Sequence, residues 1–319
     1  MLKTILNKLI YLCVMLFIIS AISFVAIHLS PNSFFASGAL NPNITKESVE
    51  LLKSIYGLDK PLYVQFFSWF KAIVSLDFGI SFSSGAFVKD EILSRLPITM
   101  TINLISMFLV FVLAFYFGIK SALKQNKTID KVVSQLSILS FCLPSFYLGL
   151  IFIYIFSIYF ELLPLSGISS DNNLTGIKYI VDTAWHLIMP ISIMVIGGFG
   201  AMTIYIRQLT IKILNQDYIF FAKSRQLSSR QIMTNYISPN LYAPVITMLG
   251  LSLPGIIGGS VILETIFSID GMGMLFFQAA LSRDYPVIMG ILIIGAFLTI
   301  LGNMIADVVL LKLNPYAKN

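Results

Sequence analysis

The sequence predicts an all-α, polytopic membrane protein with six transmembrane helices. The 319-residue chain is 57% hydrophobic and only 11% charged, whereas soluble proteins carry about 25% charged residues. Its mean hydropathy is +0.88. Its apolar residues also fall into six long runs. Each is close to the roughly 20 residues that a helix needs to cross a bilayer, where every backbone polar group must be bonded within the segment.

The predicted spans, in chain order, are residues 9–29, 97–119, 132–160, 185–206, 241–263 and 286–311. The first run is longer than the apolar core of a signal peptide, about 7 to 15 residues, so we expect it to remain as a helix. Pro144 interrupts the third run. Because proline removes a helical hydrogen bond, we expect a kink there.

Basic residues orient these spans, because Lys and Arg collect in cytoplasmic connections. They gather after the second and fourth spans, whereas the connections after the third and fifth are mainly acidic. This pattern predicts that both termini are cytoplasmic. It also explains the net charge of +6 without a nucleic-acid partner. The basic residues after the second and fourth spans are Lys120, Lys124, Lys127, Lys131, Arg207, Lys212, Lys223, Arg225 and Arg230.

The segment between the first two spans is therefore expected outside. Thr45 can cap a helix that ends at Gly57, and Pro61 can begin a second helix, PLYVQFFSWFKAIV. That aromatic helix could lie at the membrane interface, pack on the spans or touch a partner. The expected division is residues 1–96, a transmembrane helix plus an external helical segment, and residues 97–319, a five-helix core.

A compact basic stretch, AKSRQLSSRQ, lies between the fourth and fifth spans. Residues 218–225 can form a short helix with Tyr218, Phe221 and Ala222 on one face. Ser228 and Gln231 have the spacing of a capping box for a second helix, which we expect to end at Ser238 and Pro239. A water-facing loop needs no apolar face, so the stretch is predicted either to enter a groove on a soluble partner or to lie on the inner leaflet.

The sequence contains neither a phosphate-binding GxxxxGK[ST] loop nor an HExxH zinc helix. Its two histidines, His28 and His186, are far apart and are expected to be packing or interfacial residues. Asp307 is the one serious ionisable candidate within a span, and an ion pair with Lys312 or extension of its side chain to water explains it more simply than catalysis does. We therefore predict no catalytic, cofactor or metal site on this chain, and an energy source outside it.

Two blocks carry a resemblance to a known family. DYIFFAKSRQLSSRQIMTNYISPNLYAPV resembles the cytoplasmic coupling loop of binding-protein-dependent ABC permeases of the dipeptide, oligopeptide and nickel group. ETIFSIDGMGMLFFQAALSRDYPVIMG is similar to that family's stretch after the fifth span, and LDFGISF, RLPITM and LPSFYLGL resemble its first permease subunit. The resemblance implies a permease of the type I ABC importer fold, with its coupling loop at about residues 208–240.

The resemblance also implies partners. These are a second homologous permease subunit, two cytoplasmic ATPase subunits that bind the ATP, and an extracytoplasmic substrate-binding protein, all at a bacterial cytoplasmic (inner) membrane with its lipid. The implied ATPase-coupling residues are Asp217, Tyr218, Ala222, Arg225, Gln226, Leu227, Arg230 and Ile232, of which the apolar ones would fill the partner's groove. The residues matched in the external loop are Glu264, Gly271, Gly273, Arg283, Asp284 and Tyr285.

The chain departs from the family pattern at two places. Gln226 stands where the family usually has glycine at the turn of the coupling loop, so either strained backbone or another turn is expected. Ile269 and Asp270 replace a common Trp-Pro pair in the external loop. Short peptides are the expected substrate and nickel, as a chelate, the alternative. A channel or secondary transporter and an intramembrane enzyme are the more distant alternatives.

Overall fold

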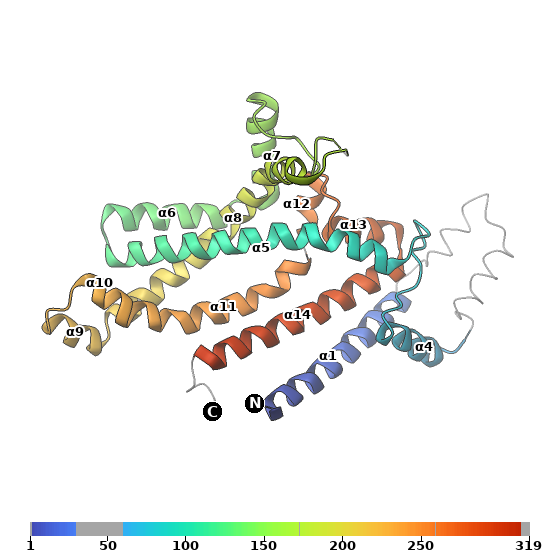
Figure 1. The fold of residues 1–319 in the computed structure, drawn as a ribbon, viewed down its shortest axis with the longest axis horizontal. Helices are drawn as coiled ribbons and strands as arrows, with labels where there is room; N and C mark the ends of the chain where they lie inside the picture. Colours follow the sequence, from blue (N-terminus) through green and yellow to red (C-terminus); the bar gives the residue numbers. More distant parts are fainter. Residues whose placement is uncertain (1, 30–59, 172, 259, 314–319) are drawn as a thin grey trace. The chain divides into compact units, whose positions relative to one another are not determined.

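The structure is a computed structural model, which describes the backbone of residues 2–29, 60–171, 173–258 and 260–313 (Figure 1). The helix expected between Thr45 and Gly57 lies outside these residues. The chain forms two compact units. Unit 1 comprises Met1–Thr99 and Asp270–Leu301, and unit 2 comprises Met100–Ile269 and Gly302–Asn319. These units differ in extent from the expected segments 1–96 and 97–319, because residues 270–301 pack with the N-terminal part.

Unit 1 contains an aromatic contact between its first two described helices, α1 (Leu2–Leu29) and α4 (Leu62–Val74). Pro61 is the N-cap residue of α4, so this helix begins where the sequence predicted. The ring of Phe66 lies 5.6 Å from that of Phe17 and 5.4 Å from that of Phe24. One face of α4 therefore packs on the first predicted span. Packing on the spans was one of the three alternatives that the sequence left open for this helix.

The core of unit 1 joins the first turns of α5 (Val88–Leu123) to α13 (Met272–Ser282) and α14 (Tyr285–Leu313). A Cβ atom on Gly290 would come within 2.7 Å of the Val88 side chain, so the close approach of α14 to α5 requires glycine there. The buried side chains of this core are Val88, Ile92, Met272, Leu275, Ala279, Val287 and Ile291.

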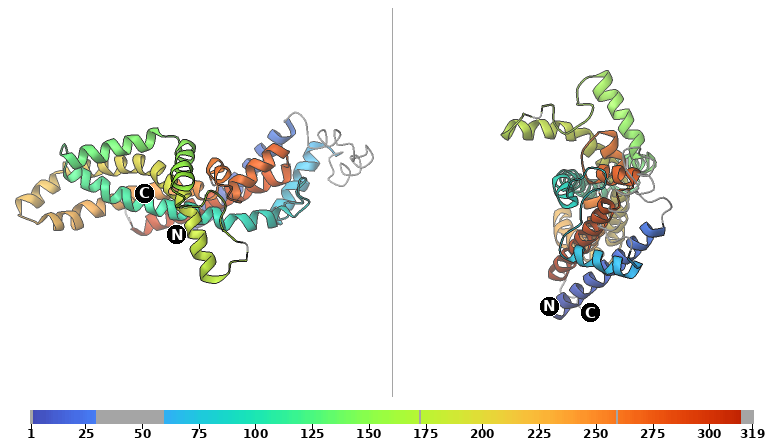
Figure 2. Two further views of the ribbon diagram at one scale, coloured as in Figure 1. Left: turned by 90° about the horizontal axis from the view of Figure 1, so that it is seen from above. Right: turned by 90° about the vertical axis from the view of Figure 1, so that its right-hand side faces the viewer.

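Unit 2 contains the rest of α5 and most of the other helices. These are α6 (Thr128–Cys142), α7 (Ser145–Phe152), the π-helical segment η1 (Ile153–Tyr159), α8 (Gly176–Leu214), α9 (Asp217–Ser224), α10 (Ser229–Ile232), the π-helical segment η2 (Met233–Ile237), α11 (Ser238–Gly258) and α12 (Val261–Ile266). Figure 1 and the left panel of Figure 2 show α9 and α10 at one end of this unit, where α8 and α11 converge.

Three helices within the described residues are long and apolar enough to cross a membrane: α5, α8 and the stretch Tyr285–Ile305 of α14. A fourth span results if α6 and α7–η1 count as one, although the two parts are bent by 96°. This bend confirms the kink predicted at Pro144, which is the N-cap residue of α7. The secondary-structure elements of the described residues are therefore helical, and three or four of them are candidate membrane spans.

Three predicted spans differ from the observed helices in informative ways. Helices α5 and α8 begin at Val88 and Gly176, well before the predicted residues 97 and 185. Their first turns contain charged and polar residues, so these turns lie outside the apolar runs from which the spans were predicted. The fifth span does not continue to residue 263 as predicted. Helix α11 ends at Gly258, and Ser260 then caps α12 by accepting a hydrogen bond from the backbone N of Leu263 at 3.3 Å.

Candidate functional site

The basic segment, defined here as Asp217–Ile237, consists of α9, α10 and η2. Helix α9 matches the predicted short helix at residues 218–225 within one residue at each end. The second helix does not end at Ser238 and Pro239 as predicted. It passes through the π-helical turn η2 directly into α11. A π turn tolerates this proline because the i→i+4 bonding pattern is already interrupted there.

Gln226 provides the turn between α9 and α10. Its φ is +58°, in the left-handed region that favours glycine. The Gln226 N–H donates to the carbonyl of Lys223 at 2.9 Å, and the Leu227 N–H donates to that of Ala222 at 3.3 Å. These two bonds form a Schellman motif, which normally has glycine at this position. The chain thus has strained backbone at Gln226, the first of the two expected outcomes.

The predicted capping box is present at the start of α10. The Ser228 hydroxyl accepts from the Gln231 N–H at 3.3 Å, and the Gln231 side chain accepts from the Ser228 N–H at 2.9 Å. Two of the unpaired N–H groups at the helix start are therefore satisfied reciprocally. The α9–α10 turn is held by local hydrogen bonds at both of its ends.

The buried face of the basic segment packs against the rest of unit 2. Its members share a core with residues of α5, α8 and α11, including Ala114, Ile119, Ile206 and Leu241. This core takes up two residues, Ala222 and Ile232, that the sequence assigned to a partner's groove. It contains Ile219, which the sequence reasoning missed, and Leu227 packs on its edge. The buried residues of the segment are Ile219, Ala222, Ile232 and Ile237.

Other side chains of the segment face outward. Phe220 and Phe221 are 68% and 64% exposed, and Arg225, Gln226 and Arg230 are exposed beside them. The sequence had suggested that Phe221 and Ala222 share one face of the helix. In the structure they do not, because Phe221 is exposed and Ala222 is buried. Asp217 begins α9 and is exposed, and Tyr218 stacks on Tyr236 with ring centroids 6.2 Å apart. Two adjacent exposed phenylalanines with cationic neighbours form a surface suited to a protein groove.

A buried ion pair that sequence reasoning missed lies near this segment. Asp130 on α6 is 3% exposed. Arg207 on α8 donates to it from Nε at 2.6 Å and from Nη2 at 2.8 Å. Ser121 donates to the same carboxylate from its hydroxyl, and Asn126 from its backbone N at 2.8 Å. In the sequence, Arg207 served only as one of the basic residues that orient the spans. No local motif identifies Asp130 as its partner.

The residues matched in the predicted external loop divide between the units. Glu264 is buried on α12 in unit 2. In unit 1, Gly271 is the N-cap residue of α13, and Gly273 is buried in its first turn. Tyr285 begins α14. Thr99 accepts a hydrogen bond from the Met272 N–H at 2.8 Å, so a side chain of α5 completes the start of α13.

Arg283 and Asp284 form the α13–α14 turn. Arg283 has φ +57°, and the Asp284 N–H donates to the Ala279 carbonyl at 2.8 Å, so α13 also ends in a Schellman arrangement. Asp284 is fully buried. Its Oδ2 accepts from the Ser81 hydroxyl at 2.6 Å, the Ser83 hydroxyl at 2.8 Å and the Ser83 N–H at 3.0 Å. The structure thereby joins the end of the LDFGISF segment and the residue after it to the second of the two family-like blocks, which contains Asp284.

The two residues that replace the Trp-Pro pair have separate roles. Ile269 is buried in unit 2, and its N–H donates to the Glu264 carbonyl at 2.8 Å. Asp270 is exposed in unit 1 and accepts from Nε of Arg95 on α5 at 2.7 Å. The substitution at position 270 thus adds an ion pair within unit 1.

Two titratable candidates remain to be placed, His186 on α8 and Asp307 on α14. His186 is buried and donates from Nδ1 to the Asp182 carbonyl at 2.8 Å, which is the packing role expected of it. Asp307 is exposed on α14, and the side chain of its expected partner Lys312 lies outside the described residues. Among the described residues, no three His, Cys, Asp or Glu side chains come together as they would around a metal ion.

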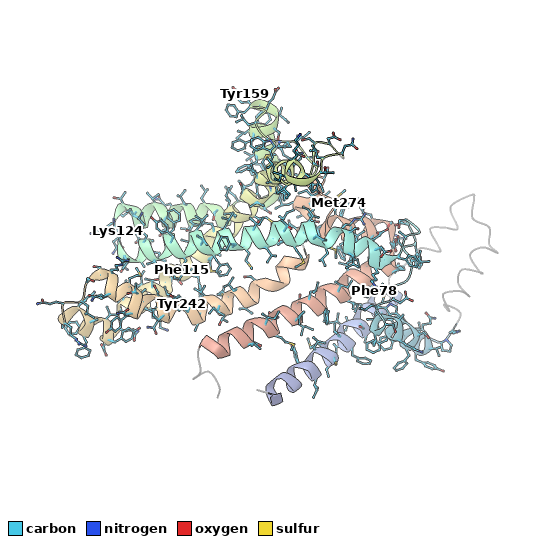
Figure 3. The ribbon with its side chains drawn as sticks, in the orientation of Figure 1. Phe78, Phe115, Lys124, Tyr159, Tyr242 and Met274 are labelled. Atoms are coloured by element: carbon cyan, nitrogen blue, oxygen red, sulfur yellow. The ribbon has the colours of Figure 1, made fainter. Side chains whose placement is uncertain are left out.

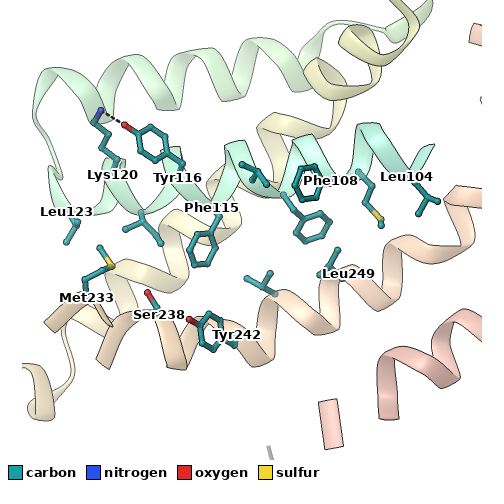
Figure 4. Close-up of a pocket in the computed structure, with 15 residues that line it drawn as sticks. Leu104, Phe108, Phe115, Tyr116, Lys120, Leu123, Met233, Ser238, Tyr242 and Leu249 are labelled. Carbon is teal, nitrogen blue, oxygen red and sulfur yellow. Dashed lines mark hydrogen bonds between the residues drawn. The ribbon is translucent and has the colours of Figure 1, made fainter. Parts of the chain in front are cut away.

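A cavity of about 1090 Å³ lies in unit 2 between α5 and the η2–α11 helix (Figure 4). In Figure 3 the labelled side chains of Phe115 and Tyr242 approach each other across it. Most of the other lining residues are Leu, Phe, Val and Met, such as Leu104 and Leu249. Such a lining suits lipid tails or an apolar helix and provides few groups for holding a polar solute.

Comparison with known proteins gives a consistent result. A family model described as the binding-protein-dependent transport system inner membrane component matches residues 114–318, and the model of its N-terminal part matches residues 1–103. The chain is 34% identical over 298 residues to the oligopeptide transport system permease protein AppB of Bacillus subtilis, covering 93% of each protein. It is 33% identical to OppB of Haemophilus influenzae, an oligopeptide permease protein, and 30% identical to DppB of Lactococcus lactis, a dipeptide permease protein, covering 99% of each. The chain therefore belongs to the family of inner membrane components of binding-protein-dependent transport systems and is a permease subunit of an ABC importer.

Proposed function

We propose that this chain forms one half of the membrane path of an ATP-driven importer of short peptides. The family membership and the peptide-transport names of the relatives support this substrate class. The other half is a second homologous permease subunit. An extracytoplasmic binding protein delivers the substrate, and two cytoplasmic ATPase subunits bind and hydrolyse the ATP.

The proposed topology has six membrane-spanning helices and cytoplasmic termini. Two contacts within unit 2 support it. The Arg207–Asp130 pair brings the basic end of α8 to the lysine-rich α5–α6 turn, so two predicted cytoplasmic connections meet. The Gly167 N–H donates to the Phe267 carbonyl at 2.7 Å, which joins two predicted external connections.

The basic segment is proposed to be the ATPase contact, and the exposure of Phe220 and Phe221 is the observation that carries this. Burying an exposed Phe side chain contributes about 1.5 to 3 kcal/mol, so the pair can anchor the segment in a groove. Arg225, Gln226 and Arg230 form the polar rim. Ala222 and Ile232, packed inside unit 2, would pass a movement of the segment to α8 and α11 in a two-state change.

Replacing both phenylalanines tests the contact. In the Phe220→Ala/Phe221→Ala variant we expect the amount of ATPase subunit that copurifies with the permease to fall at least tenfold, because loss of interface anchors typically costs more than 2 kcal/mol. The variant should still insert and fold, since neither side chain belongs to the buried core. Phe160→Ala, another exposed phenylalanine in unit 2, is the matched control. Equal copurification of all three proteins would contradict the proposed contact.

Uptake by cells lacking only this chain tests the substrate. A labelled short peptide and radioactive nickel are compared in one culture, and we expect uptake of the peptide alone to be lost. Loss of nickel uptake alone would assign a metal-chelate importer. Uptake that persists in ATP-free vesicles would indicate a channel or a secondary transporter.

A further inference from the structure

The buried carboxylate of Asp130 connects three parts of unit 2. It receives the Arg207 fork from α8, the Ser121 hydroxyl from the end of α5 and the Asn126 N–H from the α5–α6 turn. Both oxygens are therefore occupied by donors, two of them from a guanidinium that fits a carboxylate in one planar geometry. Arg207 itself is only 21% exposed at its side chain.

Stability alone is a weak reason for this arrangement. Taking both charges out of water costs several kcal/mol per ion, and well-packed apolar residues of similar volume are often equally or more stabilising. What a bidentate buried pair supplies, and an apolar pair does not, is one defined register between the helices. The ion pair thus indicates that these helices must keep one position relative to each other, and not only that they must bind tightly.

The neighbouring packing also fixes α8 against α5 and α6. A Cβ atom on Gly200 would lie 2.1 Å from the Ser137 carbonyl oxygen of α6, and one on Gly198 would lie 2.9 Å from Val110 of α5. These glycines allow the helices to approach closely, as in membrane proteins generally. The ion pair closes this contact at the end of α8 that leads to the basic segment.

Helix α8 continues for about two turns beyond Arg207 before α9 begins. Those turns carry Thr210, which is buried, and Ile213, which shares a core with Ile219 and Ala222 of α9. A displacement of α9 therefore acts on α8 close to Arg207. Without the ion pair, the end of α8 could slide on α6 while the rest of the contact stayed in place.

We infer that the Arg207–Asp130 pair is a positioning latch that makes the basic segment, α8 and the α5–α6 hairpin move as one body. This inference rests on the proposed ATP-driven function. Arg207 and Asp130 touch neither substrate nor nucleotide in this role. They determine how much of the movement imposed by the ATPase subunits reaches the membrane helices.

The test uses the full complex in proteoliposomes. Single removal of Arg207 would leave a buried charge, so the main variant is Asp130→Leu/Arg207→Met, which removes both charges. We expect it to assemble and hydrolyse ATP while transporting at least fivefold less labelled peptide per ATP. Lys212→Met, which removes an exposed charge from the same helix, should couple normally. A double variant with unchanged transport per ATP would overturn the latch.

A distance measurement gives a readout that does not depend on the substrate. Spin labels are placed at two exposed positions, Lys127 in the α5–α6 turn and Ser224 at the end of α9, with Cys13 and Cys142 replaced. In the otherwise unaltered protein the distance should stay the same when ATP and vanadate trap the complex, whereas in the double variant it should change or broaden. A distance that changes in the unaltered protein would overturn the inference.

Arg207→Lys decides the matter if the double variant does not assemble. Lysine keeps the charge but loses the planar fork, so we expect normal assembly with reduced transport per ATP. Normal coupling in this variant would refute the latch. Failure of the proposed function looks different, because the unaltered complex itself would then show no ATP-dependent uptake.

Discussion

The α9–α10 turn and the α13–α14 turn are built from the same backbone device but differ in what surrounds it. Gln226 and Arg283 each end a helix with φ near +57°, and a polar residue soon afterwards starts the next helix. At the first turn, Ser228 forms the capping box with Gln231, three residues away. At the second, Asp284 binds Ser81 and Ser83, about 200 residues distant in sequence.

The difference separates chain reversal from anchoring. A Schellman motif followed by a helix cap reverses the chain wherever it occurs, using local hydrogen bonds. Distant contacts then decide whether the turn is fixed. Asp284 is fully buried and ties its turn into unit 1, whereas Gln226 and its exposed neighbours remain accessible. An accessible turn such as the α9–α10 turn can carry a partner contact without breaking the unit's own core.

The largest predicted effect comes from removing the distant anchor. Asp284→Ala should destabilise unit 1 by about 3 kcal/mol, because it deletes an acceptor of several hydrogen bonds and leaves buried donors unpaired. Thermal unfolding in detergent measures the loss. Asp284→Asn keeps one amide oxygen as an acceptor and should lose less. If the Ala variant unfolds like the unaltered protein, the α13–α14 turn is not anchored by Asp284.

A smaller effect is expected from the local cap. Ser228→Ala should cost about 1 kcal/mol, the usual value of an N-cap hydroxyl. The loss should be confined to the basic segment and appear as faster hydrogen exchange in α10, with little change in the overall unfolding temperature. Ser229→Ala, at the exposed neighbouring position, is the control. Faster exchange in unit 1 would contradict the local character of this turn.

The features that the sequence predicted are those with short-range causes. The capping box and the break at Pro144 each follow from residues within a few positions of one another, and the positive φ at Gln226 is one of the two outcomes expected there. Composition and the apolar runs predicted the all-α membrane class, and the family resemblance supplied the transport role. The Asp130–Arg207 contact joins residues 77 apart, so no local hydrogen-bonding rule selects the partner. Ala222 and Ile232 were expected in a partner's groove but lie in the core of unit 2. An apolar helix face does not reveal from the sequence whether it packs on its own chain or on another.

The smallest predicted effect tests the shared device itself. Gln226→Gly should stabilise the α9–α10 turn by about 0.5 to 1 kcal/mol, since glycine adopts this φ without steric strain. Arg225→Gly, one residue earlier at φ −79°, should destabilise instead and serves as the control. At the other turn, Arg283→Gly should relieve the same strain, because Arg283 also has a positive φ. Hydrogen exchange measured separately over α9 and α13 compares the two. A loss of stability at Gln226→Gly would mean that the glutamine side chain, rather than the backbone bonds of the turn, holds the basic segment in place.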